Sequence, residues 1–130
     1  MRIWSVMFIV FTLVGCGEDQ KETKKIDEEL VVIKNNLYTE YYPGKKAVKY
    51  QGKQDADKKR DGKWTYYSES GLELSTTMYT HGLKDGLTLV KYPNGILHYT
   101  GEYRNDTMVG IWRTYDEKGN MVEEKDYNLE

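Results

Sequence analysis

The sequence has few of the residues on which catalytic and metal sites usually depend. Its 130 residues include one cysteine and two histidines, so no disulfide can form within the chain. His81 and His98 lack the spacing of helical zinc ligands. Ser68, Ser70 and Ser75 lie outside the strained turn that exposes a nucleophilic serine. We therefore expect no enzyme activity, no catalytic residue, no bound metal and no cofactor.

A strong charge of either sign is also missing. The formal net charge is −2, which gives no electrostatic footprint for nucleic acid and little attraction to anionic lipid head groups. Two basic runs, Lys45-Lys46 and Lys58-Lys59-Arg60, either contact phosphates or are solvated loop charge. We expect no nucleic-acid partner.

Proline and phenylalanine are scarce, with two residues of each, whereas tyrosine and glycine each occur twelve times. A tyrosine ring with its polar tip suits a half-buried β surface better than a deep core. Glycines spaced through such a sequence indicate turns between strands. A chain of this length forms one small domain.

The only long apolar run is residues 3–14, which follow a single basic residue, Arg2. As a helix this run spans about 18 Å, short of the roughly 30 Å hydrocarbon core of a bilayer. Residues 1–15 therefore read as a signal peptide rather than a membrane span.

The run ends in Leu13-Val14-Gly15-Cys16, which resembles the lipobox of bacterial lipoproteins. The resemblance implies cleavage before Cys16, a thioether-linked diacylglycerol and usually an N-acyl chain such as palmitate. Two or three acyl chains make a stable membrane anchor. The alternative is that Cys16 is a small buried hydrophobe. We expect a lipoprotein of the bacterial cell envelope rather than a cytoplasmic protein; the membrane and its face stay open.

Residues 16–29 hold the lipidated cysteine and a charged stretch without apolar periodicity, which predicts a flexible tether. The alternative is a short amphipathic helix that leads into Leu30.

Three columns of residues repeat along the remaining chain with a step of 24. They are Gly62, Gly86 and Gly110; Gly71, Gly95 and Gly119; and Tyr79, Tyr103 and Tyr127. Trp64 and Trp112 lie two steps apart, with Thr88 between them. A fixed period of this length is the signature of a repeat architecture.

Each period holds two strand-like runs separated by turn signals. Hairpin turns are predicted at Asp61-Gly62, Asp85-Gly86, Asn94-Gly95 and residues 118–120, because glycine supplies a positive φ without a Cβ clash. An edge strand is predicted at residues 30–33, and an excess of residues before Gly62 is placed in the loop at 53–60. The domain at 30–130 would hold a degenerate repeat at 36–49 and repeats at 50–78, 79–102 and 103–127.

These features predict an all-β fold: a single antiparallel meander of stacked β-hairpins, each of which buries its aromatic residues against the next. Neither face shows a clean alternation of apolar residues, so the core face stays open.

The pattern G-x-W-x-x-Y-x-x-x-G, followed by a Tyr eight residues later, resembles MORN-type repeats over about residues 36–127. It is closest to a bacterial variant whose proteins are often described as antitoxin-like. The second clear repeat departs from the pattern, with Thr88 for Trp and its Tyr one place late, at Tyr92.

We expect a membrane-anchored scaffold that binds a protein partner, of unknown oligomeric state. One alternative is a lipid- or glycan-binding module that uses its aromatic columns. Another, implied by the resemblance, is an immunity protein that faces the envelope. The candidate interaction residues are Trp64, Tyr67, Tyr92, Trp112 and Tyr115. Aromatic residues at strand spacing are otherwise interlocking core.

The anchor gives a direct prediction. Cys16→Ala removes the thiol that would carry the lipid, so the variant should lose metabolic acyl labelling and accumulate with its signal peptide attached. Acyl labelling of the variant and intact-mass spectrometry of both the variant and the wild-type protein measure these two effects. A mature N-terminus without acyl mass would contradict the lipoprotein interpretation.

Overall fold

A computed structural model describes residues 30–128 of the chain. The predicted signal peptide at 1–15, the predicted lipidation site Cys16 and the predicted tether that follows it lie outside the described residues. Within the described part of the chain, no helix is long and apolar enough to cross a membrane.

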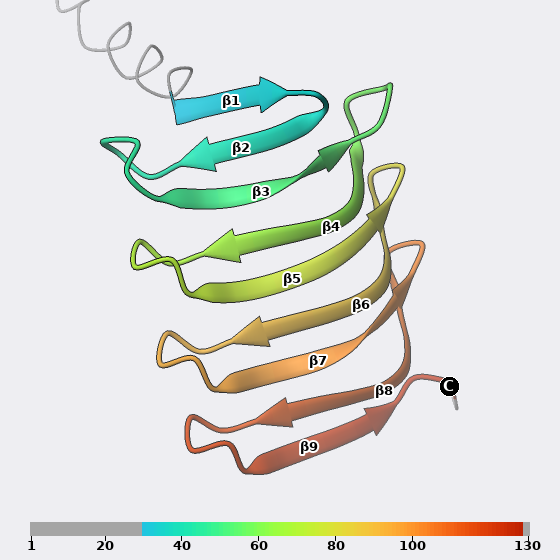
Figure 1. The fold of residues 1–130 in the computed structure, drawn as a ribbon. Coiled ribbons are helices and arrows are strands. Elements are labelled where there is room, and N and C mark those ends of the chain that lie inside the picture. Colours follow the sequence, from blue (N-terminus) through green and yellow to red (C-terminus); the bar gives the residue numbers. More distant parts are fainter. Residues whose placement is uncertain (1–29, 129–130) are drawn as a thin grey trace, which may run out of the picture.

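The described residues form one nine-stranded antiparallel sheet whose strands pair in chain order (Figure 1). The strands are β1 (Val31–Lys34), β2 (Leu37–Tyr41), β3 (Val48–Gln54), β4 (Arg60–Tyr67), β5 (Glu73–Thr80), β6 (Leu83–Lys91), β7 (Leu97–Arg104), β8 (Thr107–Tyr115) and β9 (Met121–Asp126). The turns alternate between the two sides of the sheet in Figure 1. The expected all-β fold with a single antiparallel meander is confirmed, whereas the 24-residue period stays a prediction.

The tightest turns hold residues that tolerate the left-handed backbone conformation. Asn35 and Asn36 join β1 to β2 with φ of 51° and 61°, and Asn105 and Asp106 join β7 to β8 with φ of 47° and 66°. Positive φ at both central residues matches the twist of the flanking strands. The β3–β4 turn, residues 55–59, is longer, and it lies in the loop where the sequence places its extra residues.

Two predicted hairpin turns are wrong. Asp61-Gly62 lies inside β4 and Asp85-Gly86 lies inside β6. The φ of Gly62 is 73° and that of Gly86 is 110°, so both glycines do adopt the conformation that a turn would require. They serve β-bulges instead: the pairs Gly52↔Trp64 and Lys53↔Asp61 leave two residues of β4 unmatched by β3.

Because side chains alternate along each strand, the sheet has two distinct faces. We call the first the aromatic face. It carries Tyr38, Tyr50, Trp64, Tyr79, Tyr99, Tyr103, Trp112 and Tyr127. We call the second the aliphatic face, defined by Leu37, Met78, Leu87, Leu89 and Ile111. A single-layered sheet leaves apolar side chains on both faces, which explains why the sequence shows no clean alternation.

The core lies on the aromatic face, where two tryptophans are packed against glycines. Trp64 is 3% exposed and Trp112 is 8% exposed, and they are the buried hydrophobic residues within 30–128. The ring of Trp64 lies over Gly52 and that of Trp112 over Gly101, so that a Cβ at either glycine would overlap the indole. Truncating a buried tryptophan to alanine typically costs about 3–5 kcal/mol of stability.

Both indoles also bind the backbone. Nε1 of Trp64 donates to the carbonyl oxygen of Lys53 at 2.8 Å. Nε1 of Trp112 donates to the carbonyl oxygens of Glu102 and Val109 at 3.2 and 3.1 Å. A buried indole N–H therefore keeps a hydrogen bond in each case, and the ring orientation is fixed.

Between Trp64 and Trp112 along the chain, two facing threonines stand where the aromatic clusters have a glycine that faces a tryptophan. Thr77 and Thr88 face each other across β5 and β6, and their hydroxyl oxygens are 2.8 Å apart. They stand 24 residues before Gly101 and Trp112 in the sequence. Thr88 is 3% exposed, so the threonine pair closes this part of the face with a hydrogen bond instead of a ring.

This pairing predicts a strong coupling between positions 77 and 88. Thr88→Trp alone should overpack against the Cβ of Thr77 and lower the free energy of unfolding by roughly 1–3 kcal/mol. Adding Thr77→Gly should restore much of that loss, because the ring then has a glycine beneath it. Denaturant unfolding of both single variants and the double variant measures the coupling energy. Additive effects would show that the two positions do not form one packing unit.

Candidate functional site

The first aromatic cluster is built around Trp64. The Tyr50 ring centroid lies 5.0 Å from that of Trp64, Tyr38 lies at 5.5 Å, and Tyr79 meets the indole edge-on at 6.5 Å. The rings come from β2, β3, β4 and β5, so the cluster joins four consecutive strands. Tilted and edge-on contacts at these distances are the favoured arrangements for aromatic pairs.

A cation covers this cluster. The guanidinium carbon of Arg60 lies 5.0 Å from the ring centroid of Tyr50, 5.1 Å from Trp64 and 5.3 Å from Tyr79. Arg60 Nη1 also donates to the hydroxyl of Tyr79 at 3.2 Å. A guanidinium within about 6 Å of several ring faces is attracted by their quadrupoles. Arg60 therefore makes an intramolecular cation–π contact with three rings of the first cluster.

The second aromatic cluster is built around Trp112. Tyr103 meets the indole edge-on at 5.0 Å, Tyr99 stacks at 6.1 Å, and Tyr127 approaches edge-on at 6.3 Å. Lys125 Nζ lies 4.4 Å from the ring centroid of Tyr127. This second cluster lies at the C-terminal end of the sheet, and among the described residues no strand follows β9.

A hollow of about 280 Å³ opens beside the second cluster. Its lining consists of Tyr99, Tyr103, Met108, Trp112, Thr114, Glu123, Lys125 and Tyr127. Four of these residues are aromatic and two carry opposite charges, so the walls are largely rings with one acid and one base. The arrangement is suited to holding a flat or cationic group against aromatic faces.

Burial raises the pKa of two phenols of the aromatic clusters, Tyr50 and Tyr99. Burial, followed by the neighbouring Tyr79, raises the pKa of Tyr50 to about 12. Burial also raises the pKa of Tyr99, with Tyr103 contributing in the same direction. A neutral phenol presents an electron-rich face without a formal charge, so both clusters act on cations through their rings.

The structure separates the five candidate residues. Trp64 and Trp112 are buried in different clusters on the aromatic face. Tyr67 lies on the aliphatic face, where it lines a hollow together with Lys63 and Thr65. Tyr92 follows β6, its ring stacks on His98 at 4.2 Å, and its hydroxyl donates to the carbonyl oxygen of Tyr115 at 2.9 Å.

Tyr115 lies at the end of β8, three residues beyond Trp112, and so faces away from it. The five candidates therefore do not form one continuous row. Sequence reasoning treated Arg60 only as part of a basic run and missed its contact with the rings. The sequence did place Arg60 four residues before Trp64. Met108 occupies the same position relative to Trp112.

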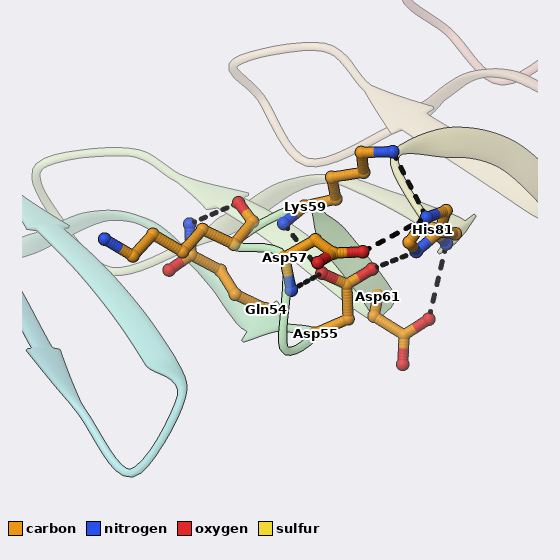
Figure 2. A network of polar contacts seen from close by, with 7 residues as sticks. Gln54, Asp55, Asp57, Lys59, Asp61 and His81 are labelled. Atoms are coloured by element: carbon orange, nitrogen blue, oxygen red, sulfur yellow. Dashed lines mark hydrogen bonds and ion pairs between the residues drawn. The ribbon is translucent and has the colours of Figure 1, made fainter.

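A second group of polar residues surrounds His81 in the β5–β6 turn (Figure 2). Its Nδ1 donates to Oδ2 of Asp55 at 2.5 Å, while Nε2 lies 3.1 Å from Nζ of Lys59 and 3.5 Å from Oδ2 of Asp57. The backbone N–H of His81 reaches Oδ1 of Asp61 at 3.5 Å. Figure 2 shows the histidine held between the acidic residues and the lysine.

Asp55 also organises its own turn. Its Oδ1 accepts the backbone N–H groups of Asp57 and Lys59, each at 2.9 Å. Desolvation acts to raise the pKa of Asp55, but hydrogen bonds from the Lys59 backbone and the His81 side chain outweigh it and hold that pKa below its ordinary value. The carboxylate thus stays charged and ties the β3–β4 turn to the β5–β6 turn.

The same residues offer three atoms for a metal ion. Oxygens of Asp55 and Asp57 and a ring nitrogen of His81 all lie within 4.8 Å of one another. However, the Lys59 ammonium already lies beside the histidine, and both ring nitrogens have partners. A cation at this position would have to displace Lys59, so the group fits a link between two turns better than a metal site.

Comparison with known proteins adds no identity. No protein-family model matches the chain, and no curated protein is significantly similar to it. The resemblance to MORN-type repeats therefore stays a prediction, and the function is argued from the geometry of the sheet.

The raised pKa of Tyr50 predicts a loss of stability at alkaline pH. A group with a raised pKa in the folded state stabilises the fold fully below its unfolded pKa, near 10, and this contribution disappears as the pH rises toward about 12. Tyr50→Phe should therefore weaken the fall in melting temperature over that interval. Thermal unfolding at a series of pH values measures this, with Tyr41→Phe as a control outside both clusters. An unchanged alkaline slope in Tyr50→Phe would contradict the assignment.

Proposed function

We propose that this protein is a lipid-anchored scaffold of the bacterial cell envelope that binds a partner protein on the aliphatic face of its sheet. The observation that carries the proposal is the set of exposed aliphatic side chains on that face. Leu87 is 67% exposed, Ile111 is 45% exposed and Leu37 is 36% exposed. These residues lie on β6, β8 and β2, and exposed apolar side chains gathered on one face of a sheet are typical of interaction surfaces.

The aliphatic face is also hollowed where its side chains diverge. One hollow of about 380 Å³ is lined by Met78, Leu87, Leu89 and Thr100, with Lys63, Glu73 and Lys91 among the polar residues of its lining. Lys63 and Glu73 form an ion pair there at 3.6 Å. An apolar floor with a charged rim is the usual anatomy of a protein interface.

The aromatic face supports the proposal by contrast. Its rings pack mainly on one another, and Trp64 is covered by Arg60 and three tyrosines. Little of the first cluster is displayed for stacking on a sugar or a lipid head group. The aliphatic face is therefore the better candidate for a broad protein contact.

The predicted lipid anchor at Cys16 places the scaffold at a membrane surface. Anchoring raises the local concentration of the sheet near any partner in the same membrane, so a modest contact on one face is sufficient for binding.

The proposal is tested by site-specific photocrosslinking in cells that naturally produce the protein. A photoreactive side chain at position 87 or 111 should give a discrete protein adduct, and one at Lys118, in the β8–β9 turn, should not. Leu87→Asp combined with a probe at 111 should abolish the adduct with little change in folding, because Leu87 is exposed.

The matched control is Leu83→Asp, which alters a leucine of 43% exposure near the β5–β6 turn and should leave the adduct intact. Adducts only to lipid from positions 87 and 111, or an adduct that survives Leu87→Asp, would contradict a protein-binding aliphatic face.

A further inference from the structure

The two aromatic clusters share one plan. In each, a tryptophan lies over a glycine of the preceding strand and donates its N–H to the carbonyl oxygen of the residue that follows this glycine. The glycines are Gly52 and Gly101, and the carbonyls belong to Lys53 and Glu102. In each, one tyrosine of the preceding strand and one from the C-terminal side flank the indole. Tyr50 and Tyr79 do so in the first cluster, and Tyr99 and Tyr127 in the second.

The clusters differ at the position four residues before the tryptophan. In the first cluster this residue is Arg60, whose guanidinium covers three rings. In the second it is Met108, an uncharged residue that lines the hollow beside Trp112. The residue midway between them, Lys84, places its ammonium 4.7 Å from the ring centroid of Tyr103. Of these three positions, spaced by 24 residues, two hold a cation against an aromatic ring and the third holds the uncharged Met108. The second cluster does carry ammonium groups at its edges, from Lys84 on Tyr103 and from Lys125 on Tyr127, but no guanidinium lies over its tryptophan among the described residues.

We propose that the hollow beside Trp112 binds the guanidinium group of an arginine side chain from another protein. The binding would reproduce, between two proteins, the contact that Arg60 makes within the first cluster. This inference concerns the aromatic face and goes beyond the proposed function, which concerns the aliphatic face.

Ring chemistry favours a guanidinium in this hollow. A guanidinium is planar and weakly hydrated, so it stacks on Trp and Tyr faces more readily than an ammonium does. Arg60 donates to the hydroxyl of Tyr79, and Tyr127 is the corresponding tyrosine of the second cluster. The hollow of about 280 Å³ has room for the end of one arginine side chain.

Charged groups of both signs lie around the hollow. Glu123 supplies a carboxylate in the lining, which attracts a cation and can accept its hydrogen bonds. Lys125 opposes a second cation, since its ammonium lies over Tyr127. Lys84 adds a second positive charge, 4.7 Å from the ring centroid of Tyr103, so the three groups together do not attract a cation. The aromatic faces and the shape of the hollow therefore carry the selectivity.

Binding is measured on the full-length protein in detergent micelles, from the indole N–H signal of Trp112 in NMR spectra. The signal is assigned with Trp112→Phe. The probe is N-acetyl-arginine-N-methylamide, and the comparison ligands are the corresponding lysine derivative and choline. The arginine probe should shift the signal saturably, with an affinity roughly fivefold or more above that for lysine. Equal or tighter binding of choline would overturn the inference in favour of a lipid head group, and no saturable shift with any ligand would overturn it outright.

Reciprocal substitutions test the proposed equivalence of the clusters. Met108→Arg should fill the hollow from within and abolish the shift at Trp112, whereas the matched control Met108→Leu should retain it. Arg60→Met should open the first cluster, so that the arginine probe shifts the Trp64 signal as well. Lys125→Gln should tighten binding of the probe, because the opposing charge is gone. Retained binding in Met108→Arg, or the absence of a new shift at Trp64 in Arg60→Met, would contradict the inference.

Leu87→Asp separates this inference from the proposed function. It should leave the response of Trp112 to the arginine probe unchanged, because Leu87 lies on the opposite face of the sheet. Loss of the Trp112 response in Leu87→Asp would contradict the claim that the two faces bind independently.

Discussion

In both aromatic clusters an indole ring packs directly on the backbone of a glycine in the preceding strand. A single-layered sheet has no second layer to cover its apolar residues, so burial has to come from side chains that lie flat on neighbouring strands. Gly52 and Gly101 make this possible by leaving the backbone bare beneath Trp64 and Trp112. The tyrosines then pack around each indole, and the two clusters divide the sheet into two cores joined by the threonine pair at positions 77 and 88.

Because the sheet has a single layer, its two faces also differ in how much side-chain area they bury. The aromatic face supplies burial, although its second cluster leaves a hollow where the first is covered by Arg60. The aliphatic face contributes less to burial and carries the exposed residues Leu87 and Ile111. A mutation therefore has a different expected effect on each face: loss of a buried ring on the aromatic face should lower stability, whereas loss of an exposed side chain such as Leu87 should leave the fold largely intact.

The sequence was sufficient to predict the all-β meander, because glycine and tyrosine recur where strands and turns alternate. It correctly marked Asn94-Gly95 and residues 118–120 as turns. It failed at Asp61-Gly62 because a positive φ serves a bulge as well as a hairpin turn, and only the register of β3 against β4 distinguishes them. It also missed the role of Arg60, because a basic run next to a loop looks solvated until the rings of Tyr50 and Tyr79 are brought together by strand pairing.

The strict chain order of the strands has a mechanical consequence. β1 is the shortest strand, pairs only with β2, and is the first element after the segment in which the sequence predicts the anchor. A force between a membrane anchor and the sheet would therefore load β1 before any other strand. Peeling β1 away would leave both tryptophan clusters intact and add its four residues to the linker, roughly 13 Å at about 3.3 Å per residue. The N-terminal strand would then lengthen the predicted tether between the anchor and the rest of the sheet.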